Sequence, residues 1–253
     1  MITIKSKSEL EKMRLAGQIS ANALHYGGQS IRVGMSTYEL DKIIHDYIVK
    51  NGAKPNFLGY GGFPGSACIS INNKVIHGIP SKTEIIQDGD IVSIDTGAYI
   101  DGFNGDNAYT FAVGNVSEEA RQLLKVTEES LYKGIEQAVV GNRVGDISHA
   151  VEEHCTSYGY GVVRKYVGHG VGAKLHESPE VPNFGKAGRG PRLVAGMTLA
   201  IEPMINAVGE EVLDNFPDGW TVLTKSGSLS AHFEHTIAIT SDGPVILTRP
   251  TII

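Results

Sequence analysis

Near its beginning, the chain places apolar residues three and four positions apart, which is the spacing of one face of an α-helix. A capping box of Ser8 and Glu11 predicts the start of a first helix, which the glycine pair at 27–28 would end. A second capping box, Ser36 with Glu39, predicts the start of another helix. The predicted inward faces are Leu10, Met13, Ala16, Ile19 and Ala23 in the first helix, and Leu40, Ile43, Ile44, Tyr47 and Ile48 in the second.

The remaining apolar pattern is mostly that of short β-strands, interrupted by two further helices. One of these helices would begin near Ser117 and the other at Asp146. The turn Asp101-Gly102 would join two longer strands. We therefore expect a mixed α+β fold in a single catalytic domain, residues 1–253. The predicted strands cover residues 69–71, 75–76, 91–100, 109–113, 162–167, 197–205, 220–224, 232–240 and 244–248.

Part of this pattern occurs twice, with an offset of 107 residues. Under this offset Asp95 falls on Glu202, and each of these acids ends an apolar run that is typical of a strand. A carboxylate in a core strand is unfavourable unless something compensates its charge. We therefore expect two related halves, roughly residues 1–115 and 116–253, with a shared metal site between them. Other matches are Val33-Gly34 with Val140-Gly141, Glu39-Leu40 with Asp146-Ile147, Gly52 with Gly159, and Gly89 with Gly196.

Composition and charge exclude several classes of protein. The net charge is −6, whereas a nucleic-acid-binding surface needs clustered Lys and Arg. Cys68 and Cys155 are the only cysteines, too few for a disulfide framework, which fits a reducing compartment. The sequence has no run of about 18 apolar residues, as a membrane span requires. We therefore expect a cytoplasmic protein with neither nucleic-acid nor membrane partners.

A second pair of acids occurs at the larger offset of 128, where Asp106 and Glu234 each precede a β-rich stretch. The predicted hairpin would bring Asp106 close to Asp95. Four carboxylates in one place repel one another unless cations lie between them, and two divalent ions would balance their charge. Oxygen ligands suit Mn, Fe(II), Co or Zn. His169, between glycines that permit tight turns, is the best candidate for an additional nitrogen ligand.

In this order along the chain, Asp95, Asp106, His169, Glu202 and Glu234 resemble the five metal ligands of the type I methionine aminopeptidases. The resemblance covers essentially the whole chain and implies the pita-bread fold of that family, in which two related halves enclose a dinuclear centre. The flanking strings that carry it are Cys68-Ile69-Ser70-Ile71-Asn72, His77-Gly78-Ile79-Pro80, Gly168-His169-Gly170, Ile201-Glu202-Pro203 and Glu234-His235-Thr236.

The resemblance also implies a role for each ligand. Asp95 would bind one metal ion, and Asp106 and Glu234 would bridge both. His169 and Glu202 would hold the other ion. Glu202 would also be catalytic, because it would handle the proton of the attacking water. The nucleophile would be a hydroxide that bridges the two divalent ions.

The substrate site is implied in the same way. His77 and His176 would be catalytic and would contact the substrate, with His176 stabilising the tetrahedral intermediate. A methionine side chain needs an apolar and flexible slot. Phe57 and Leu175 match pocket positions at which other bacterial members often differ, and Asn104 departs from the family pattern near the second Asp. The pocket positions proper are Tyr60, Phe63, Cys68 and Trp220.

The family also has a monovalent-cation site, and Asn72, Lys74 and Ser230 match its positions. The implied partners are the N-termini of nascent polypeptides and peptides. Docking on the ribosome and the identity of the divalent metal stay open at this point, and a monomer is the default expectation.

Other interpretations were weighed against this one. Asp95 alone could be a strand-end acid, His77 could brace its turn, and His176 could be a surface histidine. His232 and His235 are interpreted as structural. At the level of the whole chain, a metal-free binding module and a proline-directed peptidase of the same fold are the rivals. All five ligand positions are retained, which argues against the first, and the stretch before Asp95 is too short for the extra domain typical of the second.

Overall fold

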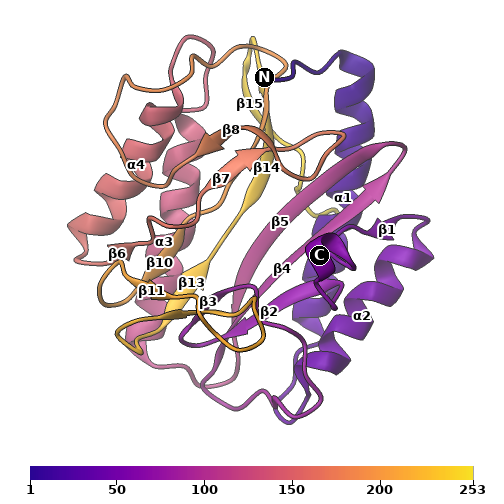
Figure 1. Ribbon diagram of the computed structural model, residues 1–253, viewed down its shortest axis with the longest axis vertical. Helices are drawn as coiled ribbons and strands as arrows, with labels where there is room; N and C mark the ends of the chain where they lie inside the picture. The colour runs from indigo at the N-terminus through magenta and orange to yellow at the C-terminus, as the bar shows by residue number, and fades with distance from the viewer. Residues whose placement is uncertain (253) are drawn as a thin grey trace.

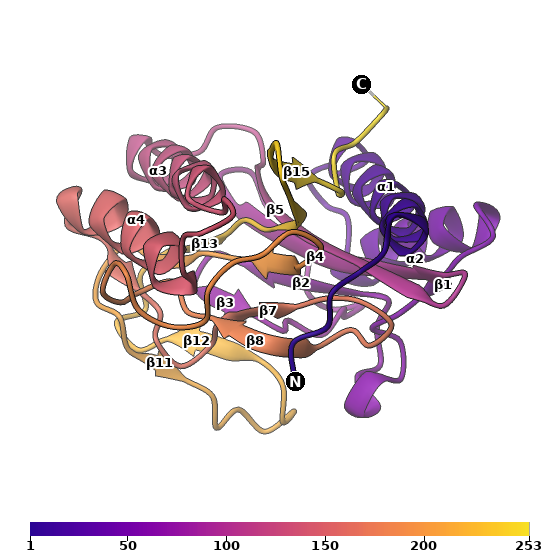
Figure 2. The same ribbon diagram turned by 90° about the horizontal axis from the view of Figure 1, so that it is seen from above.

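Four helices cover one side of the molecule, and antiparallel strands form the rest (Figure 1, Figure 2). The structure is a computed structural model that describes residues 1–252. Helix α1 packs on α2, and α3 packs on α4. No helix within the described residues is long and apolar enough to cross a membrane. The helices are α1 (Lys7–Gln29), α2 (Thr37–Lys50), α3 (Glu118–Glu136) and α4 (Val144–Ser157).

Helix α1 begins earlier and ends later than predicted. Its cap is Ser6, whose backbone N–H donates to the Glu9 carboxylate at 2.7 Å. The predicted cap was wrong because the same Ser-x-x-Glu pattern occurs twice in overlap, two residues apart. The helix also continues through its glycine pair. A Cβ atom at Gly27 would lie 2.7 Å from the side chain of Ile44, so this glycine permits close packing of α1 on α2 instead of ending the helix.

The other helix starts are close to their predicted places. Ser36 caps α2 with the predicted capping box, and the Ser117 hydroxyl accepts the Ala120 N–H at the start of α3. Helix α4 begins at Val144, two residues before Asp146, which lies in its first turn. Helices α2 and α3 form where the sequence supplies both a capping side chain and an apolar face.

The strands form four small antiparallel sheets. Their orders are β1-β4-β2 with β5 on β4, β13-β10-β6, β11-β12-β3 and β15-β14-β9-β7-β8. The strands of the first half are β1 (Lys54–Pro55), β2 (Ala67–Ile71), β3 (Lys74–Ile76), β4 (Ile91–Ile100) and β5 (Phe103–Ala112). Those of the second half are β6 (Gly161–Val162), β7 (Gly168–Gly170), β8 (Glu177–Val181), β9 (Thr198–Ile201), β10 (Met204–Asn206), β11 (Val212–Leu213), β12 (Val222–Thr224), β13 (Ser230–His232), β14 (His235–Thr240) and β15 (Gly243–Ile246).

The hairpin of β4 and β5 is the longest pair, and its turn is the predicted one. Asp101 and Gly102 both have positive φ, 52° and 86°, as a tight two-residue hairpin turn requires. Strand β5 starts at Phe103, six residues before the predicted start. The prediction was too short because the stretch from Asn104 to Asn107 is polar, although most of it is buried.

Two predicted strands are each broken in the structure. The stretch 197–205 divides into β9 and β10 at Glu202-Pro203, and the stretch 232–240 divides where β13 ends and β14 begins. The two breaks face each other, because Met204 pairs with His232 on one side of them. The same two chain segments therefore pair first in one sheet and then in another. The predicted strand 162–167 is also short, limited to β6.

The sequence repeat has a counterpart in the backbone. Gly34 donates to the carbonyl of Ile86 at 2.9 Å, and Gly141 donates to that of Leu193 at 3.1 Å. Both glycines have positive φ, and both bonds are related by the offset of 107 residues. The glycine pairs Gly52 and Gly159, and Gly89 and Gly196, also have positive φ. Each half contains its own apolar core, one including Leu40, Ile44, Ile69 and Ile94, the other Leu123, Ile147, Leu199 and Ile237.

Candidate metal centre and substrate pocket

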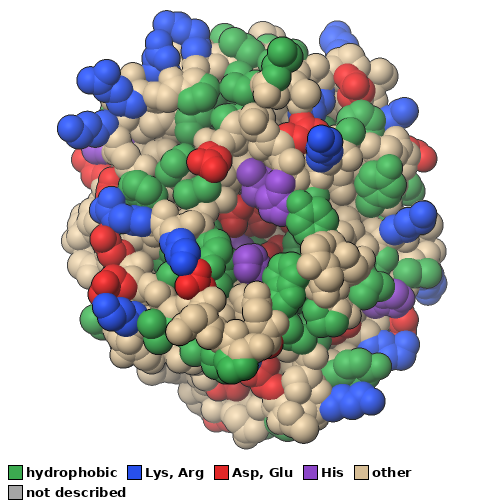
Figure 3. Space-filling view, in the orientation of Figure 1, with side chains coloured by type: hydrophobic (Ala, Val, Ile, Leu, Met, Phe, Trp, Pro, Cys, Tyr) green, Lys and Arg blue, Asp and Glu red, His purple; other side chains and the backbone are tan. Residues whose placement is uncertain are grey.

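A cavity of about 190 Å³ lies between the two halves. Figure 3 shows acidic side chains at the floor of a central hollow with histidines at its rim. All of the predicted divalent-metal ligands and substrate-site residues line this cavity. They are Asp95, Asp106, His169, Glu202 and Glu234, with His77, His176, Tyr60, Phe63, Cys68 and Trp220, and Phe57 and Leu175 lie beside them.

Strands β4 and β5 position the first two acids. In the antiparallel register Asp106 lies opposite Gly97, two residues along β4 from Asp95. Residues two apart on a strand share one face of the sheet, so the two carboxylates are diagonal neighbours on the cavity side. Cys68 of β2 lies opposite Asp95 on the other side.

The two glutamates come from the strand breaks. Glu202 directly follows β9, and Pro203 after it has no N–H with which to continue a ladder. Glu234 precedes β14, and its backbone exchanges hydrogen bonds with Ala108 of β5, the N–H of Glu234 donating at 2.9 Å. The first half and the second half therefore meet at the residues that carry the acids.

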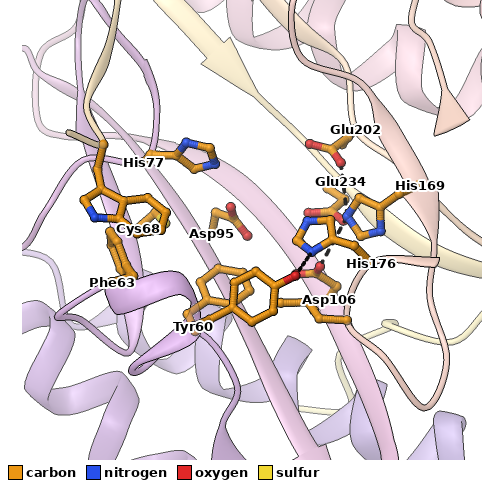
Figure 4. Close-up of a pocket in the computed structure, with 13 residues that line it drawn as sticks. Tyr60, Phe63, Cys68, His77, Asp95, Asp106, His169, His176, Glu202 and Glu234 are labelled. Atoms are coloured by element: carbon orange, nitrogen blue, oxygen red, sulfur yellow. Dashed lines mark hydrogen bonds and ion pairs between the residues drawn. The ribbon is translucent and has the colours of Figure 1, made fainter. Parts of the chain in front are cut away.

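His169 projects from β7 toward these acids (Figure 4). Its Nδ1 lies 2.9 Å from the Gly170 carbonyl, which can only accept, so Nδ1 carries the proton and Nε2 has a free lone pair. Nε2 lies 3.5 Å from Glu202 Oε1 and 3.7 Å from Asp106 Oδ2. Burial, with a smaller contribution from His176, lowers the pKa of His169 to about 4, so the ring is neutral, as a metal ligand must be.

Burial and mutual repulsion make the four acids resist ionisation. Burial first, and then neighbouring carboxylates, raise the pKa values of Asp95, Glu202 and Glu234 well above their usual range. Burial raises the pKa of Asp106 to about 7. Among the described residues, one oxygen of each of Asp95, Asp106 and Glu234 is buried without a hydrogen-bond partner.

These orphaned oxygens fit divalent cations. Uncompensated buried carboxylate oxygens are unfavourable, and a metal ion would satisfy them and lower the pKa values that burial raises. Ligand atoms of Asp106, His169 and Glu234 lie within 4.8 Å of one another, close enough to share an ion. Asp95 and Glu202 line the same cavity from opposite halves.

Beside the acids lies an apolar slot. Phe57, Phe63, Cys68 and Leu175 form a buried cluster, against which Trp220 packs with its ring 5.1 Å from that of Phe63. Burial, followed by the charge of Asp95, raises the pKa of the Cys68 thiol well above its usual value, so Cys68 is a small apolar wall and not a nucleophile.

Two histidines stand at the edges of the slot. His77 has a positive φ of 60°, an uncommon conformation for a side chain of this size, and its ring lies 6.1 Å from that of Trp220. Tyr60 Oη lies 2.9 Å from Nδ1 of His176, as drawn in Figure 4. The ring of His176 lies 4.1 Å from that of His169. Neither histidine is therefore an isolated surface residue.

The residues predicted for a monovalent cation lie outside the cavity. Ser230 donates its backbone N–H to the carbonyl of Asn72 at 2.9 Å, so these two are in contact. The expected contribution of Lys74 is its backbone carbonyl, and its side chain, on β3, forms an ion pair with Glu84.

Two residues outside the predicted site contact Glu202. His232 is buried, and its Nε2 lies 3.5 Å from Glu202 Oε2. Its interpretation as a structural histidine stays a prediction. Asn183 was missed entirely: its side chain donates to the Glu202 carbonyl at 2.9 Å, a contact that nothing in the local pattern indicates.

A neutral imidazole, four clustered carboxylates of which two are almost fully buried, and an adjacent apolar slot define a metal-dependent protein with a small substrate site. The model of metallopeptidase family M24 matches residues 11–241. A methionine aminopeptidase of Clostridium acetobutylicum is 54% identical over 248 residues, which are 98% of this chain and 99% of that protein. Crystal structures of methionine aminopeptidases from Rickettsia prowazekii and Thermotoga maritima superpose with TM-scores of 0.96, at 40% and 45% identity, and cover 98% of this chain and 100% of theirs.

The chain belongs to the methionine aminopeptidases of metallopeptidase family M24, and is thus a hydrolase with the pita-bread fold. The resemblance drawn from the five acid and histidine positions is confirmed at the level of family and fold.

Proposed function

We propose that this enzyme hydrolyses the N-terminal methionine from nascent proteins and peptides, with two divalent metal ions held by Asp95, Asp106, His169, Glu202 and Glu234. When bound, the ions would supply a hydroxide nucleophile between them by lowering the pKa of water. The observation that carries the proposal is the set of buried carboxylate oxygens without hydrogen-bond partners, directly beside an apolar slot. The curated relatives carry the name methionine aminopeptidase.

The chain's own residues would perform the remaining steps. Glu202 would accept the proton of the attacking water and return it to the leaving amine, a role that suits a carboxyl whose pKa burial raises. His176 would donate from Nε2 to the developing negative charge, and in the tautomer that this role requires Nδ1 would accept the hydrogen bond of the Tyr60 hydroxyl. His77, on the opposite side of the slot, would hold the substrate backbone.

The slot would select methionine by shape and polarity. Its walls are apolar, and the whole cavity is small, about 190 Å³, so a flexible unbranched side chain fits best. Tyr60 and Trp220 would close its open side, and Phe63 and Cys68 would form its floor. The acids lie next to the slot, so the free amino group of a first residue would be placed among negative charges.

Several further expectations belong to the same proposal. The chain would form one catalytic domain, with halves at roughly residues 1–115 and 116–253, and act as a monomer in the cytoplasm. Asn72, Lys74 and Ser230 would provide a monovalent-cation site. The divalent metal would be Co, Mn, Fe(II) or Zn, which accept mixed oxygen and nitrogen ligands. Nascent chains would be the protein partners, and binding to the ribosome would be tested separately.

A peptide assay tests this function. Release of methionine from Met-Ala-Ser should stop after treatment with a chelator and return when Mn²⁺ or Co²⁺ is added. An N-acetylated Met-Ala-Ser peptide is the control and should not be cleaved, because its amino group is blocked. Turnover that survives the chelator, with no metal detected by elemental analysis, would contradict the mechanism.

A further inference from the structure

The segment that carries His176 into the cavity contacts the site only through the side chains of Leu175 and His176. It runs from Val171 to His176, between β7 and β8, and places Leu175 and His176 at the slot. A loop of this length can position a catalytic side chain only if other contacts fix its backbone. Asn104 of β5 supplies one group of such contacts: its backbone N–H donates to the carbonyl of Gly172, and its side-chain amide donates to the carbonyls of Gly172 and Ala173.

A second group of contacts involves Thr3 and Lys5, near the beginning of the chain. Glu177, the residue after His176, accepts a hydrogen bond from Lys5 Nζ at 2.6 Å and another from the Thr3 hydroxyl. The side chains of Lys5 and Glu177 are only 5% and 10% exposed. The other carboxylate oxygen of Glu177 accepts the backbone N–H of Lys174 at 3.1 Å. One buried carboxylate therefore ties the N-terminal segment to both ends of a turn in the loop.

The packing around this ion pair leaves no free space. A Cβ atom at Gly172 would lie 2.5 Å from the Glu177 carboxylate and 2.7 Å from Cε of Lys5. The backbone N–H of Lys5 donates to the carbonyl of Gly196 at 2.8 Å, which anchors the N-terminal segment next to β9. Figure 2 shows this segment, in indigo, running past β7 and β8 before α1 begins.

The electrostatics agree with this geometry. Burial alone raises the pKa of Glu177, but hydrogen bonds from Lys5 and Thr3 lower it by more, so the net shift is downward. The carboxylate is therefore ionised and paired. A desolvated pair of this kind leaves the remaining charge uncompensated when one partner is removed, so the loop cannot keep its arrangement without Lys5.

We propose that residues 2–5 are a positioning arm for the reaction, and that Lys5 and Glu177 are positioning residues that act through His176. Neither residue lines the cavity, and the arm contributes no catalytic group. This inference rests on the proposed function, because it assigns a cause to the placement of His176. It predicts that a substitution in residues 2–5, which are far in sequence from the residues that line the cavity, lowers the turnover rate. The same substitution should leave metal binding unchanged.

The test compares Lys5→Met and Glu177→Gln with Lys42→Met, whose lysine forms an exposed ion pair with Asp46 on α2. Lys5→Met and Glu177→Gln should lower kcat for Met-Ala-Ser by about 10- to 100-fold with little change in KM, the scale of a small misplacement of a catalytic group. Metal content should be unchanged, and Lys42→Met should behave as the parent enzyme. A wild-type kcat in Lys5→Met would overturn the proposal.

A double-mutant cycle separates positioning from general stabilisation. If Lys5 acts through His176, adding Lys5→Met to His176→Ala should cause no further loss of kcat. Losses that multiply would show that Lys5 acts elsewhere and would overturn the proposal. If His176→Ala itself is as fast as the parent enzyme, the proposed role of His176 fails, which is a result distinct from a failure of the arm.

Hydrogen exchange provides a readout that does not depend on activity. In Lys5→Met the amides of Gly172 and Lys174 should exchange faster than in the parent, whereas Lys42→Met should leave them unchanged. If Lys5→Met does not fold, Thr3→Val removes one hydrogen bond to Glu177 and should give a smaller change in the same direction. If the amides of Gly172 and Lys174 exchange at the parent rate in a folded variant, residues 2–5 do not position the loop.

Discussion

Replacing Asp106 with Asn should stabilise the metal-free protein, and the gain should grow with pH. Burial raises the pKa of Asp106 from 3.8 to about 7 in the folded protein. Between these values the folded carboxyl retains a proton that the unfolded chain releases, so the free energy of unfolding falls as pH rises. About three pH units at roughly 1.4 kcal/mol each give a loss of about 4 kcal/mol by pH 7. The Asp106→Asn variant cannot ionise at this position and avoids that loss.

The measurement is urea unfolding of both proteins in excess chelator at about pH 4, 5.5 and 7. The variant should match the parent near pH 4 and exceed it by about 4 kcal/mol at pH 7. Titrations of groups remote from Asp106 occur in both proteins and cancel in the difference. Asp46→Asn, on the exposed face of α2, is the matched control, and its difference from the parent should stay within about 1 kcal/mol at every pH.

Adding metal should narrow the difference between the two proteins. At pH 7, an ion present at 100 times its Kd should stabilise the parent by about 2.7 kcal/mol, because it binds only the folded state. The variant lacks one ligand and should gain much less. The difference in the free energy of unfolding between the two metal-free proteins should rise with pH. If it is constant or falls as pH rises, then the ionised Asp106 does not destabilise the metal-free fold and needs no cation to compensate its charge.

Three further predictions concern single side chains. Glu202→Gln should lower kcat by at least about 100-fold in the Met-Ala-Ser assay, since it removes the proposed proton acceptor, and a mild effect would mean that the role is misassigned. His77→Ala should lower kcat/KM by about 10- to 100-fold while elemental analysis still finds both metal ions, and loss of metal would instead make His77 a ligand. Gly17→Ala should cost about 1–3 kcal/mol in urea unfolding, because its Cβ would lie 2.6 Å from the Leu247 carbonyl, and an unchanged midpoint would contradict that close approach.

The helices could be predicted from the sequence because their signals are local. Ser36 and Ser117 each cap a helix within the next three residues, so a short window contains the whole signal. The start of α1 shows the limit of this approach. Ser6 and Ser8 both fit the same pattern, and the choice between them depends on where the N-terminal segment packs, which no local window contains.

The strand breaks could not be predicted because their cause is not local. Residues 197–205 have the composition of one continuous strand, and only Pro203 indicates an interruption. The break occurs because this segment changes sheets at the same level as the segment around Glu234. That correspondence needs the pairing of two stretches roughly thirty residues apart. For the same reason the contact of His232 with Glu202 was missed, although both residues were noted.

The repeat was more informative about the site than any single motif. Asp95 and Glu202 occupy equivalent places in the two halves, and both line the cavity in which the halves meet. Asp106 and Glu234 correspond only at a longer offset, because β11, β12 and the loops around them lie between the two glutamates of the second half. A shared centre between related halves therefore follows from the sequence, whereas the distances within it depend on the sheet pairing.

The residues that stabilise this fold and the residues proposed to bind metal lie in different parts of the molecule. The apolar cores lie under the helices of each half, at residues such as Ile44 and Leu123, and contain none of the acids. The acids occupy the junction, where strands change sheets and several carboxylate oxygens have no protein partner. Metal binding would therefore stabilise the junction more than the cores. Loss of metal should loosen the contact of β5 with Glu234 before either half unfolds, because that contact joins the halves and lies directly at the uncompensated charges.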